Sequence, residues 1–96
     1  MKKQFNKLSP AEAERLFILL EELGEAQQAI GKILRHGYLT GYPKDGPNNK
    51  AILELELGDV LLAIDMLAEN HDIDYTELEC RKAIKAEKIK MYLHHQ

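Results

Sequence analysis

The chain has one cysteine, no tryptophan and no long apolar run, and the scarcity of cysteine and of long apolar runs each excludes a class of protein. The single cysteine, Cys80, excludes an intrachain disulfide and a zinc site built from several cysteines, and it favours a reducing, cytoplasmic setting. No apolar run reaches the roughly 20 residues that a membrane-spanning helix needs, so no membrane partner is expected. The N-terminal segment Met1–Lys7 lacks the apolar core of a signal peptide, and secretion is not expected.

Basic side chains are also in the minority. The formal net charge of -3 argues against binding to a nucleic-acid polymer, which normally requires a basic surface. With 96 residues, of which 45% are hydrophobic, the chain suits a single domain with a modest core. Many chains of this size add an oligomeric interface.

Three segments show helical periodicity and none alternates with period two, so the predicted fold class is all-α. Ser9 is expected to cap the first helix, with Glu12 completing a capping box. Gly37 is expected to end that helix in the left-handed conformation. The expected arrangement is an antiparallel bundle of the three helices, assembled as an oligomer. The predicted helices span about residues 10–36, 49–70 and 75–93.

Segment 37–48 is predicted to be a loop, because glycine and proline residues interrupt it. About a dozen residues is long for a connection in a compact helical domain, so the loop is either a plain connector or a binding loop. Residues 16–20 of the first helix are apolar on all sides, which is more than one partner within the chain would cover. This pattern predicts self-association into a homodimer or a homotetramer.

The second predicted helix carries two carboxylates on its apolar side. At about 100° per residue, Glu56 and Asp59 project among Ile52, Val60 and Ala63 instead of joining the polar side. They lie one turn apart and can converge on one point. Because burying an ionised carboxylate is unfavourable unless something compensates it, either a cation lies between the two or this face lines a polar cleft.

The first predicted helix carries Glu22 and Glu25 at the same spacing. Alone, they read as a solvated run of charge, but an antiparallel pairing of the two helices would place them opposite Glu56 and Asp59. Four carboxylates suit a hard cation such as Mg²⁺, or Mn²⁺, better than zinc. Since carboxylate-bound Mg²⁺ commonly completes its shell with substrate phosphates, the substrate is expected to be a phosphate ester or a phosphoanhydride.

Glu22-x-x-Glu25 and Glu56-x-x-Asp59, each on a predicted helix, resemble the metal-binding signature of the MazG-like all-α nucleoside triphosphate pyrophosphohydrolases. The surrounding Leu-Leu-Glu-Glu-Leu-Gly-Glu and Glu-Leu-Gly-Asp-Val-Leu-Leu-Ala-Ile-Asp extend the resemblance, which covers roughly residues 9–68. It implies a helical dimer or tetramer that uses Mg²⁺ to hydrolyse a (d)NTP to the monophosphate and pyrophosphate. It also implies that the metal ligands are Glu22, Glu25, Glu56 and Asp59.

Thirty residues separate Glu25 from Glu56, somewhat more than compact members of that family are expected to have, and the extra length falls in the loop. A carboxylate that is not fully engaged by metal can orient the attacking water as a general base, and Glu21 and Glu25 are both candidates. Basic and aromatic side chains are candidates for substrate contacts, although a solvated helix face explains them as well. These substrate-contact candidates are Lys32, Arg35 and Lys44 around the loop, and Arg81, Lys85, Lys88 and Tyr92 in the third predicted helix.

Two other functions fit the same residues. A non-catalytic helical oligomerisation module would use the acidic side chains only to fix helix register or to pair with basic side chains of a partner. The same scaffold acting on a phosphoribosyl nucleotide would keep the metal site and change the substrate.

Overall fold

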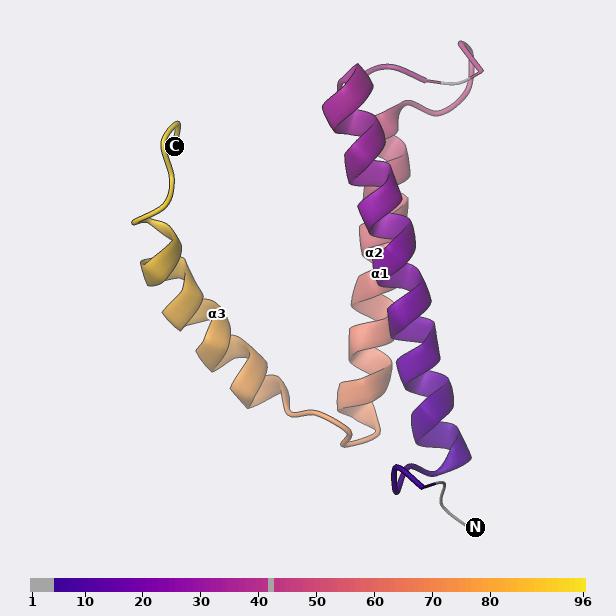
Figure 1. Cartoon of the computed structure of the whole chain (residues 1–96), viewed down its shortest axis with the longest axis vertical. Coiled ribbons are helices and arrows are strands. Elements are labelled where there is room, and N and C mark those ends of the chain that lie inside the picture. The colour runs from indigo at the N-terminus through magenta and orange to yellow at the C-terminus, as the bar shows by residue number, and fades with distance from the viewer. Residues whose placement is uncertain (1–4, 42) are drawn as a thin grey trace.

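The computed structural model describes residues 5–41 and 43–96. In these ranges the chain forms three helices and no strand, which confirms the all-α prediction. Helix α1 spans Pro10–His36, α2 spans Asn49–Glu69 and α3 spans Tyr75–Ile89, so the third helix ends before the predicted position 93 (Figure 1). None of the helices in the described ranges combines the length and the hydropathy that crossing a membrane requires.

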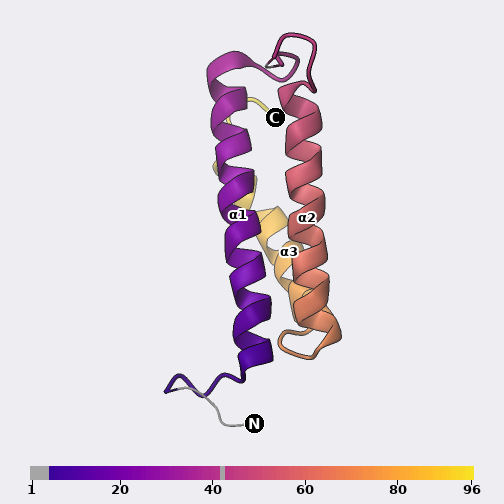
Figure 2. The same ribbon diagram turned by 90° about the vertical axis from the view of Figure 1, so that its right-hand side faces the viewer.

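Helices α1 and α2 form an antiparallel hairpin and lie side by side along most of their length (Figures 1 and 2). Ala26 and Ala29 of α1 are buried, and so are Val60, Ala63 and Leu67 of α2; three of these five are alanines. Such side chains let two helices approach closely. Among the described residues only six apolar side chains are buried, and Leu67 is the largest of them, so the hairpin alone has a small core.

The two ends of α1 depend on local sequence. The Oγ of Ser9 accepts a hydrogen bond from the backbone N–H of Glu12 at 3.1 Å, and the carboxylate of Glu12 accepts one from the N–H of Ser9 at 2.8 Å. The capping box is therefore present as predicted. Gly37 ends the helix with φ 87° and ψ 168°, not in the left-handed helical region that we expected. That combination of angles is essentially restricted to glycine.

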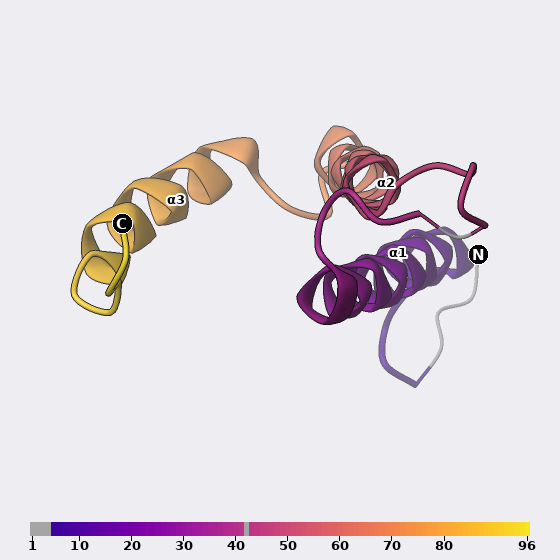
Figure 3. The ribbon, with the colours of Figure 1, turned by 90° about the horizontal axis from the view of Figure 1, so that it is seen from above.

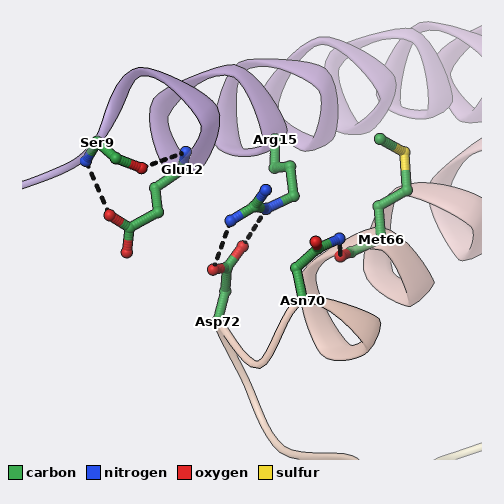
Figure 4. A network of polar contacts seen from close by, with 6 residues as sticks. All are labelled: Ser9, Glu12, Arg15, Met66, Asn70 and Asp72. Atoms are coloured by element: carbon green, nitrogen blue, oxygen red, sulfur yellow. Dashed lines mark hydrogen bonds and ion pairs between the residues drawn. The ribbon is translucent and has the colours of Figure 1, made fainter. Parts of the chain in front are cut away.

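An ion pair joins α1 to the chain that follows α2 (Figure 4). Nε and Nη2 of Arg15 donate to the two carboxylate oxygens of Asp72 at 2.5 and 2.9 Å. Asp72 is aimed at Arg15 because α2 ends in a Schellman motif, in which His71 has a φ of 63° and the N–H of Asp72 donates to the carbonyl of Leu67 at 2.9 Å. The hydrogen bonds from Arg15 lower the pKa of Asp72.

The loop between α1 and α2 is held at its base by Asn49. The backbone N–H of Asn49 donates to the carbonyl of Thr40 at 2.8 Å, and its buried side chain donates from Nδ2 to the carbonyl of Gly37 at 3.0 Å. Gly41 and Asn48 form an isolated antiparallel bridge, and Asn48 also caps α2. These contacts fix the loop's two ends at the start of α2.

Helix α3 diverges from the hairpin after the turn that follows α2 (Figures 1 and 3). At its start, the hydroxyl of Tyr75 donates to Asp65 of α2 at 2.6 Å, and this hydrogen bond raises the pKa of Tyr75 to about 12. Beyond that point α3 makes no contact comparable with the one between α1 and α2. A bundle that includes all three helices therefore remains a prediction about the assembled protein.

Candidate metal centre

The four carboxylates that the sequence predicts as metal ligands lie together at the middle of the hairpin. One carboxylate oxygen from each of Glu22, Glu25, Glu56 and Asp59 lies within 4.8 Å of the other three. The antiparallel pairing brings the helix middles together, and the spacing of three residues directs both carboxylates of each helix to the same side. Two short sequence motifs about thirty residues apart thus form one cluster, which we call the acidic cluster.

Two oxygens of the acidic cluster have no partner. Oε2 of Glu22 and Oε2 of Glu56 are buried, and neither accepts a hydrogen bond from any described group. Buried polar atoms in folded proteins are nearly always paired, because losing water without gaining a partner is unfavourable. Each of these oxygens therefore lacks a donor or a cation.

Charge repulsion acts on the same side chains. Burial raises the pKa of Glu22, and the negative charges of Glu25 and Asp59 raise it further. For Glu56, a hydrogen bond with the carboxyl group of Glu25 raises the pKa, and burial and the neighbouring carboxylates add to the effect. Without a cation, the acidic cluster is expected to hold a proton among its members, since carboxylates this close do not all ionise.

The donor set fits a hard divalent cation. It consists of oxygen atoms alone, which Mg²⁺ and Mn²⁺ accept and zinc rarely does. Opposite ligands of one Mg²⁺ lie about 4.2 Å apart, twice the usual Mg–O distance of about 2.1 Å. The observed spread of up to 4.8 Å is slightly larger, so a shift of a few tenths of an ångström in flexible glutamate side chains would bring the oxygens to that geometry.

The chain matches no protein-family model, no curated protein and no solved structure. The MazG-like resemblance therefore remains a prediction. The geometry of the acidic cluster is what bears on function.

Glu21 and the loop-side basic residues lie on the same side of the hairpin as Glu25. Glu21 is exposed, and its charge contributes to the raised pKa of Glu22. Lys32 and Arg35 line a hollow of about 350 Å³ beside the loop. Lys32 lies two turns after Glu25, about 10 Å along the helix axis and on a similar side of α1. A ligand of moderate length could therefore touch both the acidic cluster and this hollow.

The remaining substrate-contact candidates lie elsewhere in the chain. Lys44 is exposed on the loop and does not line the hollow. Arg81 and Lys85 line a groove of about 790 Å³ between α3 and the hairpin, together with Leu61. Leu61 is about 200° around α2 from Asp59, so this groove lies on the far side from the acidic cluster. Lys88 and Tyr92 are also exposed, the latter beyond the end of α3.

Several residues at these sites have no clear signal in the sequence. His36, Thr40 and the buried Asn49 line the hollow with Lys32 and Arg35. Asn49 looks like a helix cap from its position in the sequence, and only the loop contacts show that its amide holds the base of the loop. Patterns that rely on spacing along one helix do not find residues that a loop brings together.

Proposed function

We propose that this protein is a Mg²⁺-dependent nucleoside triphosphate pyrophosphohydrolase of the MazG-like type. It would hydrolyse a (d)NTP to the monophosphate and pyrophosphate. The observation that carries the proposal is the convergence of four carboxylates within 4.8 Å, two of which have a buried oxygen without a partner. A purely structural role leaves those oxygens unexplained, whereas a divalent cation satisfies both.

The acidic cluster would hold Mg²⁺, with Mn²⁺ as a substitute, through Glu22, Glu25, Glu56 and Asp59. When bound, the metal supplies charge neutralisation at phosphate oxygens and makes a coordinated water more acidic. The two unpaired oxygens of Glu22 and Glu56 lie inside the hairpin and would fix the ion on its inner side. The side away from them is left for substrate phosphates.

Glu21 is our first candidate for the general base. It neighbours Glu22, is exposed, and is not among the four carboxylates that converge. It therefore keeps a free carboxylate that can accept the proton of an attacking water. Glu25 is the second candidate, because a ligand that binds through one oxygen retains the other.

Lys32 and Arg35 would neutralise the phosphate chain of the substrate. The hollow that they line, about 350 Å³, lies within the usual size range for small-ligand sites. A phosphate chain that extends from the acidic cluster towards this hollow would be consistent with the roughly 10 Å between Glu25 and Lys32 along α1. Arg81 and Lys85 line the groove beside α3, on the far side of the hairpin, so they would reach this site only from another chain.

A second candidate is a helical oligomerisation module without catalytic activity. The large exposed apolar side chains of the hairpin favour it, among them Leu20 and Leu34. In that case the carboxylates would only fix the register of the helices. Self-association as a homodimer or homotetramer is common to both candidates, and Cys80 supports a reducing, cytoplasmic setting for either.

The deciding experiment is a pyrophosphate-release assay on the full chain with Mg²⁺, over a panel of ribo- and deoxyribonucleoside triphosphates. We expect release from at least one of them, with loss of release when the metal is chelated. A phosphoribosyl nucleotide belongs in the panel, because release from that substrate alone would assign the alternative substrate class. Absence of release from every substrate, with no stabilisation by Mg²⁺, would leave the oligomerisation module as the better explanation.

A further inference from the structure

The loop end of the hairpin is electropositive, although the chain as a whole has a net charge of -3. Residues 26–53, which run from the second half of α1 through the loop into α2, contain four basic residues and a single acidic one, Asp45. The end of α1 and the start of α2 lie side by side here (Figure 2). Because the dipoles of these two helix ends have opposite sign, they largely cancel, and the side chains determine the local charge.

Lys32 and Arg35, which line the hollow beside the loop, have no hydrogen-bond or ion-pair partner among the described residues. In contrast, Arg15 is paired with Asp72. Neither Lys32 nor Arg35 has an acidic residue three or four positions away on α1, and no carboxylate is among the described residues that line the hollow. Two like charges one turn apart repel each other, so the hollow lacks a negative charge.

Carbonyl oxygens at the end of α1 would disfavour an anion, but donors cover three of them. The N–H of Gly37 donates to the carbonyl of Ile33 at 2.7 Å. Oγ1 of Thr40 donates to the carbonyl of His36 at 2.6 Å. Nδ2 of the buried Asn49 donates to the carbonyl of Gly37 at 3.0 Å. Since Thr40, His36 and Asn49 all line the hollow, two of these hydrogen bonds remove acceptors from its wall.

We infer that the hollow is an oxyanion subsite, which binds the pyrophosphate end of the substrate without help from a metal ion, and that Thr40 is its positioning residue. Lysine and arginine bind phosphate oxygens through charge-assisted hydrogen bonds, and the planar guanidinium can donate two of them in parallel. The identity of the anion rests on the proposed function. The excess of positive charge in the hollow does not.

The hollow is close enough to the acidic cluster for one substrate to occupy both. Ile52, which lines the hollow, lies about 6 Å before Glu56 along α2. Lys32 lies about 10 Å after Glu25 along α1, and helical side chains lean towards the N-terminus, which here means towards the acidic cluster. Hydrolysis to a monophosphate and pyrophosphate breaks the anhydride between the α and β phosphates. The β and γ phosphates would therefore extend into the hollow and leave from it as pyrophosphate.

This placement of the phosphates has two consequences for binding. A nucleoside diphosphate has one phosphate fewer to place in the hollow, so we expect it to bind less tightly than the triphosphate. Inorganic pyrophosphate fills the same hollow, so we expect it to inhibit in competition with the nucleotide.

The first experiment is a calorimetric titration of the full chain with sodium triphosphate, an inorganic anion, after all metal has been removed on a chelating resin. The variants are Lys32→Gln, Arg35→Gln and the control Lys50→Gln. Lys50 is exposed near the same end of the hairpin but lines a different cavity, beside Tyr38.

We expect saturable binding by the wild type and by Lys50→Gln. For Lys32→Gln and Arg35→Gln we expect dissociation constants about tenfold higher, because each variant loses a charge-assisted hydrogen bond. Absence of binding by the wild type would overturn the inference. Equal weakening by Lys50→Gln would also overturn it, because overall charge would then explain the binding.

The second experiment tests Thr40 as a positioning residue. Thr40→Val keeps the shape of the side chain and leaves the carbonyl of His36 without its donor, whereas Thr40→Ser keeps the hydroxyl. We expect Thr40→Val to raise the dissociation constant for inorganic triphosphate by roughly fivefold, the value of about one hydrogen bond, and Thr40→Ser to restore it. In the nucleotide assay Thr40→Val should raise KM and leave kcat within a factor of about two. Equal behaviour of the two variants would overturn the role of Thr40.

Failure of this inference and failure of the proposed function give different results. Binding of inorganic triphosphate that depends on Lys32, without pyrophosphate release from any nucleotide, would support the oxyanion subsite and reject the enzyme. Mg²⁺-dependent release with the same KM in the wild type and Lys32→Gln would support the enzyme and overturn the oxyanion subsite.

Discussion

Two groups of carboxylates lie where α1 meets α2 and the turn after it, and their environments are opposite. Asp72 accepts two hydrogen bonds from Arg15, which lower its pKa (Figure 4). Glu22 and Glu56 each have a buried oxygen without a partner, and their pKa values are raised. The first contact stabilises the hairpin by itself, whereas the second opposes folding until a cation or a proton compensates it. This difference is the basis on which we propose a cation at the acidic cluster and none at Asp72.

The largest expected effect comes from removing one carboxylate of the acidic cluster. Glu56→Gln keeps the size of the side chain and removes a negative charge from the metal site. We expect Mg²⁺-dependent pyrophosphate release to fall by at least about 100-fold, because a ligand that positions the ion is lost. Steady-state assays with saturating Mg²⁺ measure this change.

The matched control is Glu54→Gln, on the same helix and exposed to solvent. It removes one negative charge, as Glu56→Gln does, and leaves the acidic cluster intact, so activity should stay within a factor of about two. Equal losses in the two variants would mean that overall charge, and not the metal site, governs activity.

The next effect is the stabilisation of the hairpin by metal. At a Mg²⁺ concentration 100 times its dissociation constant, binding to the folded state alone adds about 2.7 kcal/mol to the free energy of unfolding. Denaturation by urea with Mg²⁺ or with a chelator measures it. Asp59→Asn should lose this increment, and without metal it should be as stable as the wild type or more so, since repulsion is relieved. A variant that is less stable than the wild type without metal would indicate a structural role for Asp59.

Acid titration distinguishes Asp72 from Glu22 and Glu56, because their contributions to the free energy of unfolding change with pH in opposite directions. The pKa of Asp72 is lowered on folding, so its stabilising effect is present above its unfolded value of about 3.9 and is lost as the pH falls through the lower folded value. The pKa values of Glu22 and Glu56 are raised, so without metal their effect on stability becomes unfavourable as the pH rises above about 4.3 through the folded values.

Unfolding by urea between pH 3 and pH 7, with a chelator present, tests both of these pH dependences of the free energy of unfolding. Asp72→Asn should be less stable than the wild type at pH 7 and should approach it at acid pH. Glu56→Gln should be more stable than the wild type at pH 7, and the difference should shrink as the pH falls. Parallel curves for the wild type and Asp72→Asn would show that the ion pair with Arg15 does not contribute.

The residues that the sequence locates best are those whose role depends on neighbours along one helix. Ser9 and Glu12 form a capping box through a spacing of three residues, and Glu56 and Asp59 share one side of α2 for the same reason. The pairing of the two acidic motifs needs only the assumption of an antiparallel hairpin. These features were therefore predictable from periodicity.

Contacts between distant segments were not predictable in the same way. Arg15 and Asp72 are 57 residues apart, and they meet because His71 adopts a positive φ at the end of α2. Positive φ is uncommon for residues other than glycine, so the sequence around His71 does not by itself predict this conformation. The divergence of α3 is also absent from the sequence pattern, because its helical periodicity is the same whether it packs on its own hairpin or on another chain.

The smallest effect that we predict concerns the capping box at the start of α1. This contact lies within one helix, so it is a reference for the ion pair of Arg15 with Asp72 and for the acidic cluster, which both join distant segments. Ser9→Ala removes the hydroxyl that accepts from the N–H of Glu12 at 3.1 Å, and should lower the free energy of unfolding by about 1 kcal/mol at any pH near neutrality and with or without Mg²⁺. Ser9→Asp is the control, because aspartate also caps helices, and it should retain most of the stability. If Ser9→Asp loses as much as Ser9→Ala, the hydroxyl acts through something other than the cap. If the loss depends on Mg²⁺, the start of α1 and the acidic cluster are coupled along the helix, and the local contact is no longer an independent reference.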